Sequence, residues 1–171
     1  MDDISLKTGD IILSYVKTTR NPSTWISTAI RKISNQDWSH ISIVVSCWDT
    51  LFFIEALPGG VKMTPLKEHP EDLSIMVMRP NFNFNERDIA IKAMSKIGHT
   101  DYDMTSVLWF QFLKQVTKKW YGNTNASTKT DKSMYCSELV GWIYDIPNWW
   151  ELTPGDFTNS DKFTKLYTII Q

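Results

Sequence analysis

The sequence lacks the features that direct a chain into a membrane or out of the cell. Residues 1–7 have no basic start followed by an apolar run, so no signal peptide is predicted. The longest apolar-rich stretch, residues 104–113, is interrupted by polar residues and is far shorter than the roughly 20 residues that span a bilayer. We therefore expect a soluble, cytoplasmic protein without a transmembrane segment, in which Cys47 and Cys136 are reduced thiols.

The chain is also poor in metal ligands and in net charge. Its two cysteines and three histidines show no metal-ligand spacing, and neither a metal nor another cofactor is predicted. The 18 basic and 19 acidic residues give a net charge of -1. This near-neutral balance argues against a nucleic-acid-binding protein. No repeat or linker divides the sequence, so we predict a single domain over residues 1–171 and leave the oligomeric state open.

Apolar patterns and turn signals predict strands in the first half of the chain and helices in the second. Strands are predicted at residues 11–15, 40–47, 51–56, 61–66, 73–78 and 163–170. Helices are predicted at residues 23–33, 86–97 (capped by Asn85 and ended by Gly98), 105–120 and 135–144, with an exposed polar loop at 121–132. The predicted fold class is α+β, a small antiparallel sheet of about five to six strands packed with helices.

Cys136 is the first candidate for a chemical role. It follows a polar loop and begins the amphipathic segment 135–144, which places it in the first helical turn. Unpaired N–H groups and the positive end of the helix dipole favour a thiolate at that position. A buried, inert cysteine that happens to begin a helix is the alternative, and position alone favours it slightly.

His40 and Glu55 supply possible partners for the thiol. His40 begins the predicted strand 40–47, from which its ring can reach over the sheet edge, although a partly exposed strand-end histidine is the simpler interpretation. If residues 47–50 form a four-residue hairpin loop, Ser46 pairs with Leu51 and Glu55 lies diagonal to His40 on the same face. Glu55 then orients the imidazole; the alternative is a solvated edge glutamate.

Several motifs, in their order along the chain, resemble the YiiX/YaeF-like permuted papain-like amidases of the NlpC-like clan. These motifs are Gly9-Asp10-Ile11-Ile12, Trp38-Ser39-His40-Ile41-Ser42-Ile43-Val44, Phe53-Ile54-Glu55-Ala56, Tyr102-Asp103, Tyr135-Cys136-Ser137-Glu138-Leu139-Val140 and Leu152-Thr153-Pro154-Gly155-Asp156-Phe157. They extend over nearly the whole chain. The resemblance implies a circularly permuted papain-like fold, in which the histidine precedes the cysteine.

The resemblance also implies a function and a set of site residues. Cys136 is the expected nucleophile, His40 the base and Glu55 the orienting residue, with an acyl-enzyme intermediate. The N–H of Cys136 is the expected oxyanion donor, with Tyr135 nearby. We predict further substrate contacts from Trp38, Ser42 and Tyr102. The expected activity is that of a cysteine hydrolase (an amidase or peptidase) acting on a small peptide, a peptidoglycan fragment or a lipid, with acyl transfer as the alternative to hydrolysis.

Other interpretations remain at this stage. The chain could instead be a relative without catalytic activity that binds a peptide, glycan or lipid in the same cleft. A thiol-reactive probe distinguishes an enzyme from such a binding module, because only an active site labels much faster at Cys136 than at Cys47. Cys47 is predicted to face away from His40, in the core. Asp10 and Asp156 follow glycines and are interpreted as turn formers.

Overall fold

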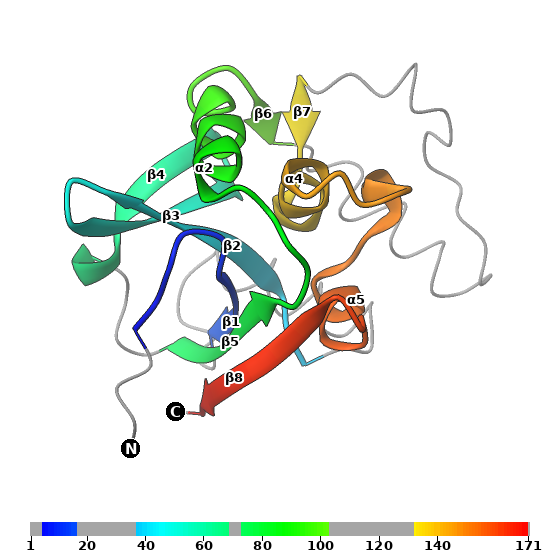
Figure 1. The fold of residues 1–171 in the computed structure, drawn as a ribbon. Coiled ribbons are helices and arrows are strands. Elements are labelled where there is room, and N and C mark those ends of the chain that lie inside the picture. The colour runs from blue at the N-terminus through cyan, green and yellow to red at the C-terminus, as the bar shows by residue number, and fades with distance from the viewer. Residues whose placement is uncertain (1–4, 17–36, 69–72, 103–131, 171) are drawn as a thin grey trace.

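The computed structural model describes residues 5–16, 37–68, 73–102 and 132–170 (Figure 1). The predicted helices at 23–33 and 105–120, and all but the last residue of the predicted loop 121–132, lie outside these ranges. None of the helices within the described ranges is long and apolar enough to cross a bilayer.

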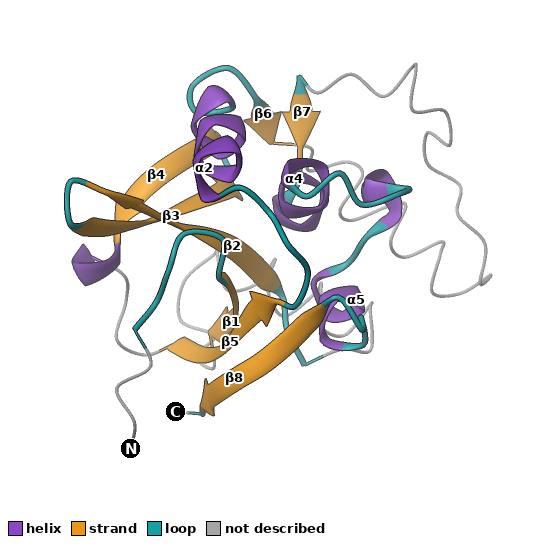
Figure 2. Ribbon diagram, viewed as in Figure 1, coloured by secondary structure: helices purple, strands orange, loops and turns teal. Residues whose placement is uncertain are grey.

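Six strands form one antiparallel sheet in the order β4-β3-β2-β1-β5-β8 (Figure 2). Their bounds are β1 Ile11–Val16, β2 His40–Cys47, β3 Thr50–Leu57, β4 Gly60–Pro65, β5 Leu73–Pro80 and β8 Phe163–Ile169. These strands confirm the six that were predicted, to within two residues at each end. A short parallel pair, β6 (Asp101–Tyr102) with β7 (Ser133–Met134), was not predicted.

The period-two alternation of the strands divides the buried residues of the sheet between two apolar clusters. One cluster takes Ile41, Ile43 and Ile54, together with apolar residues of the helices. The other takes Val44 and Phe53, which lie at the alternate positions of the same two strands. Both faces of these central strands therefore bury apolar side chains.

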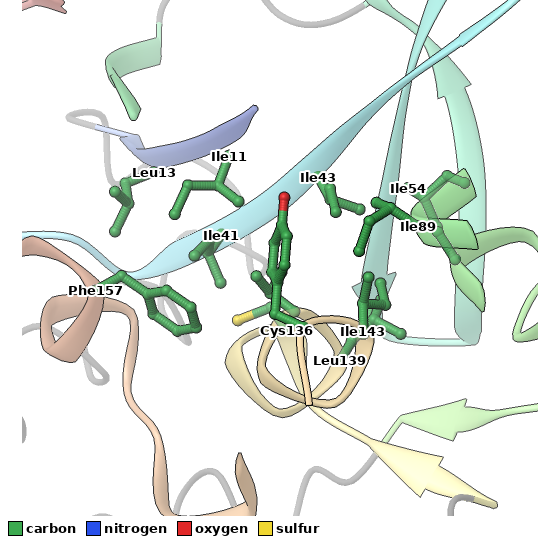
Figure 3. Packing of buried hydrophobic residues seen from close by; sticks show 14 of the residues in the cluster. Ile11, Leu13, Ile41, Ile43, Ile54, Ile89, Cys136, Leu139, Ile143 and Phe157 are labelled. Carbon is green, nitrogen blue, oxygen red and sulfur yellow. The ribbon is translucent and has the colours of Figure 1, made fainter. Parts of the chain in front are cut away.

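Helices α2 (Glu86–Ser95) and α4 (Cys136–Ile143) pack on the first of these clusters. Figure 3 shows Leu139 and Ile143 of α4 close to Ile41 and Ile43 of β2. Each fully buried aliphatic side chain of this kind contributes roughly 1.5–3 kcal/mol to folding. The packing therefore fixes α4 firmly against the strand that begins with His40.

Three short helices complete the described part of the fold. They are η1 (Leu66–Glu68), η3 (Trp149–Glu151) and α5 (Pro154–Thr158). The prediction for α2 is confirmed at its start, where the Asn85 side chain accepts hydrogen bonds from the first turn. The architecture is α+β, as predicted.

Residues 98–100 cover part of the outer side of β4. Val61 N–H donates to the carbonyl of Thr100 at 3.1 Å, and Gly98 N–H donates to the carbonyl of Val61 at 3.4 Å. Gly60 is required at this close approach, because a Cβ there would come within 2.8 Å of the Thr100 carbonyl oxygen. The outer side of β4 is thus occupied at this end by the loop after α2.

Candidate active site

The pairing of β2 with β3 places His40 and Glu55 on the same face of the sheet. Ser46 lies opposite Leu51, which is the register predicted from the sequence. The ladder extends to Ile43 opposite Ile54, and one further step in the same register sets Glu55 opposite Ser42, two residues from His40. The diagonal contact joins His40 Nε2 to Glu55 Oε2 at 2.7 Å.

The turn of this hairpin is shorter than predicted. Cys47 pairs with Thr50, so the loop contains only Trp48 and Asp49 rather than four residues. Both turn residues have positive φ, 48° and 58°, as in the tight turns whose twist matches that of the flanking strands. The register is unchanged, because Cys47 and Thr50 extend the same ladder by one pair.

Glu55 is a carboxylate that lies almost entirely inside the protein, with 4% of its surface exposed. The alternative of a solvated edge residue is therefore wrong. A buried carboxylate is costly unless it is paired. Its Oε2 contacts His40, and its Oε1 accepts a hydrogen bond from the hydroxyl of Thr64 on β4 at 3.4 Å. Both carboxylate oxygens thus have partners that hold the side chain in one orientation.

The pKa of His40 reflects three neighbouring effects. Burial lowers the pKa of this imidazole, but Cys136, as a negative charge and a hydrogen-bond partner, raises it, and so does Glu55. The outcome is a pKa raised from 6.5 to about 10. Because Nε2 faces Glu55, Nδ1 is the ring nitrogen left for the thiol. The ring therefore lies between a carboxylate and a sulfur.

Cys136 is the first residue of α4, and its predicted position at the helix N-terminus is confirmed. The preceding residue, Tyr135, is extended (φ -95°, ψ 175°) and acts as the N-cap. The N–H groups of the first turn have no partner within a helix and carry the positive end of its dipole. Cys136 is only 3% exposed, whereas the side chain of His40 is 21% exposed. Solvent therefore reaches this pair mainly from the side of the imidazole.

The residues on either side of Cys136 are bonded to the segment Trp149–Leu152. The Tyr135 hydroxyl donates to the carbonyl of Trp150 at 3.2 Å, and the Ser137 hydroxyl donates to the carbonyl of Leu152 at 2.7 Å. Glu138 Oε2 accepts a hydrogen bond from the backbone N–H of Tyr135 at 3.1 Å. The start of α4 is thus held by side chains as well as by its backbone.

The remaining predicted residues lie in different surroundings. Trp38 is 7% exposed and its ring packs on Tyr15 with a centroid distance of 5.5 Å, while Ser42 is 2% exposed. Tyr102 belongs to β6, but its side chain is not among the described groups. Their predicted contacts with a substrate stay predictions. Cys47 is only partly buried, at the far end of β2 from His40, so its predicted place in the core is wrong.

Sequence reasoning missed two residues that hold the site together, Thr64 and Ser137. Thr64 could have been found by extending the strand register across the Pro58-Gly59 turn, since Glu55 lies opposite Lys62 and Thr64 is the next residue on the same face. Ser137 carried no such signal, because its partner Leu152 comes from a segment whose docking on α4 depends on the tertiary fold.

Among the described residues, no three His, Cys, Asp or Glu side chains gather in the way that a metal site requires. The Glu55 carboxylate and the Cys136 thiol instead both act on the imidazole ring of His40. Such an arrangement can generate a thiolate, hold the imidazolium beside it and pass a proton to a leaving group.

Comparisons with known proteins identify a family and a fold for the chain. Residues 5–163 match the model of the Peptidase C92 family, described as a permuted papain-like amidase enzyme, YaeF/YiiX. None of the curated proteins matches the chain. A crystal structure described as metalloprotein YiiX from Escherichia coli O157:H7 is 20% identical, with a TM-score of 0.67 over 96% of this chain and 98% of that chain. At that identity, the likeness to YiiX shows a shared fold.

Proposed function

Because the chain belongs to the C92 family of permuted papain-like amidases, we propose that it is a cysteine hydrolase of amide or ester bonds that uses Cys136, His40 and Glu55. Cys136 is the nucleophile, His40 the acid and base, and Glu55 the residue that orients the ring. The observation that carries the proposal is the 2.7 Å contact between Glu55 and the same imidazole whose pKa is raised by Cys136.

The first half of the reaction forms an acyl-enzyme. The Cys136 thiolate attacks the substrate carbonyl carbon, so that a C–S bond forms and the π electrons move to the oxygen. The backbone N–H of Cys136, at the start of α4, is available to stabilise this oxyanion. As the oxyanion collapses, the bond to the leaving amine or alcohol breaks, and the His40 imidazolium gives that group its proton. A thioester on Cys136 remains.

The raised pKa of His40 suits this sequence of steps. The negative charge of Cys136 is a main cause of the shift to about 10. Attack on the carbonyl removes that charge from sulfur, so the pKa of His40 falls while the leaving group needs a proton. His40 then becomes neutral and takes a proton from water, whose oxygen attacks the thioester. The thiolate leaves and the imidazolium is restored.

Glu55 acts on this cycle through the ring alone. Its carboxylate holds Nε2 at 2.7 Å and directs Nδ1 toward the thiol. It also stabilises the cationic form of the ring, in which His40 spends part of each turnover. If an alcohol or an amine takes the place of water in the second half, the same groups perform acyl transfer.

The substrate class is tested with three pools: peptidoglycan peptides, other N-acyl amides and phospholipids. Each pool is incubated with the protein, the reaction is quenched in acid, and the mass of the Cys136 peptide is measured. We expect a mass increase equal to one acyl group from one of the pools. Cys136→Ala and His40→Ala abolish this species, and Glu55→Ala reduces it.

Cys47→Ala is the matched control, since Cys47 is the other free cysteine and lies away from His40. This variant keeps the adduct at the wild-type level. An adduct that persists in Cys136→Ala rejects the assignment. Equal, slow alkylation of Cys136 and Cys47 in the wild type, with no adduct from any pool, favours a binding module that uses the same cleft without catalysis.

A further inference from the structure

Cys136 is flanked by two hydroxyl groups that both reach the same neighbouring segment. Tyr135 and Ser137 are 1% and 0% exposed, so their hydroxyls are bonded inside the protein rather than to bulk water. Their acceptors, the carbonyls of Trp150 and Leu152, lie two residues apart, at 3.2 and 2.7 Å from the donors. Residues 135 and 137 are therefore joined to one short piece of chain, with Cys136 between them.

The same segment is fixed to α4 one turn further along. At Gly141, an added Cβ would come within 2.6 Å of Leu152 Cδ1 and 2.9 Å of Trp149 Cβ. Trp149 and Trp150 also pack edge to face with ring centroids 5.6 Å apart. Contacts at both ends of Trp149–Leu152 thus hold it against the helix, and its two carbonyls become fixed points for the hydroxyls of Tyr135 and Ser137.

We propose that the segment Trp149–Leu152 is a brace that sets the position of the Cys136 sulfur relative to His40, acting through the hydroxyls of Tyr135 and Ser137. This inference rests on the proposed function. Tyr135 and Ser137 are positioning residues: neither side chain takes part in proton transfer, because each hydroxyl proton is directed at a backbone carbonyl.

The physical reason is the sensitivity of the thiol–imidazole contact to small movements. Cys136 begins the helix, and the ends of a helix fray more readily than its interior. A displacement of about 1 Å in a catalytic group can cost about 100-fold in rate. Two buried hydrogen bonds on adjacent residues restrict the backbone of Cys136 on both sides, where the helix supplies the fewest bonds of its own.

The test compares Tyr135→Phe, Ser137→Ala and the double variant with the wild type. Thr158→Val is the matched control, since its hydroxyl also donates to a backbone carbonyl, that of Gly155, at 2.7 Å, but in α5. Alkylation of Cys136 by iodoacetamide at pH 7 is followed by mass spectrometry. The titration of the His40 ring is followed by NMR, and the unfolding midpoint by circular dichroism.

We expect each single variant to slow alkylation of Cys136 by roughly 10-fold and the double variant by up to about 100-fold. The pKa of His40 falls in these variants, because the sulfur that raises it has moved away. Thr158→Val changes neither the alkylation rate of Cys136 nor the pKa of His40, even if its unfolding midpoint falls as far as those of the Tyr135 and Ser137 variants. A purely structural role for the two hydroxyls predicts lower midpoints with an unchanged titration of His40.

The inference is overturned if either folded single variant keeps the wild-type alkylation rate and the wild-type pKa of His40. The proposed function fails separately, in the wild type itself, if Cys136 is alkylated no faster than Cys47. The alkylation rate and the pKa of His40 are measured without a substrate, so they test the brace whichever bond the protein cleaves. If the double variant does not fold, the two single variants are sufficient for the test.

Discussion

Replacing Glu55 with glutamine separates the charge of this residue from its hydrogen bond. The amide oxygen of glutamine can still accept a hydrogen bond from Nε2 of His40, but the negative charge at 2.7 Å is lost. Two unit charges about 4 Å apart interact by roughly 4 kcal/mol at the effective dielectric of a protein site. The retained hydrogen bond and partial exposure of the ring reduce this, so we expect the pKa of His40 to fall by about 1–2 units.

The assay is an NMR titration of the imidazole nitrogens from pH 5 to pH 11. The signal of His40 is identified by its loss in His40→Asn. In the wild type the titration midpoint of His40 is expected at about pH 10. In Glu55→Gln the midpoint moves downward, and in Glu55→Leu, which removes both the charge and the acceptor, it moves further.

Turnover is measured on the same variants with whichever substrate forms the acyl-enzyme. Loss of an orienting carboxylate beside a catalytic histidine is expected to lower kcat by about 100-fold or more, with little change in KM. An unchanged titration of His40 in Glu55→Gln refutes the electrostatic reasoning. Wild-type turnover in Glu55→Leu, in which both the charge and the hydrogen-bond acceptor are gone, refutes the role of Glu55 in orienting the ring.

The remaining predictions concern pH, a third partner and stability. The pKa of His40 is higher in the folded protein than its unfolded value near 6.5. Its contribution to the free energy of unfolding is therefore complete below pH 6.5 and is lost as the pH rises through about 10. Urea titrations of the wild type at increasing pH show this loss of stability, and the same titrations of His40→Asn do not. Thr64→Val removes the hydroxyl donor that holds the Glu55 carboxylate in its orientation toward the ring, so the pKa of His40 falls, whereas Thr64→Ser keeps both the donor and the wild-type pKa. Equal pKa values of His40 in the two variants refute a role for this contact. Arg79→Met leaves Asp10, which is 1% exposed, without its bidentate partner at 2.7 and 2.8 Å and costs about 3 kcal/mol in the free energy of unfolding. Asp10→Ala costs less, since the side chain of Arg79 is 30% exposed and can be solvated.

The hairpin that carries the site was predictable because strand alternation has a period of exactly two residues. With a hairpin loop assumed at residues 47–50, that period set the register of Ser46 with Leu51 and hence the side of Glu55. The turn length was wrong, because Trp48-Asp49 lacks the asparagine–glycine pattern that marks two-residue turns. Adding a pair to the ladder does not change its register, so the error did not reach the site.

Contacts that depend on tertiary structure could not be derived in this way. Asp10 does close a turn with Lys7, but its pairing with Arg79 joins residues 69 positions apart. Asp156 was interpreted as a turn former, whereas it accepts hydrogen bonds from Thr153 at the start of α5. A proline at the first helical position was the signal for this short helix, and it was missed.

The loop that lies along β4 determines where another polypeptide could extend the sheet. At the sheet margin nearest Glu55, Thr100 and Gly98 already occupy backbone groups of Val61, so an incoming strand finds no continuous row of donors and acceptors there. The opposite margin is β8, where the register shifts between Val77 and Met78 and Lys165 interrupts the apolar character. Irregularity and charge are common protections against unwanted strand addition. Strand addition is therefore disfavoured at both margins of this sheet.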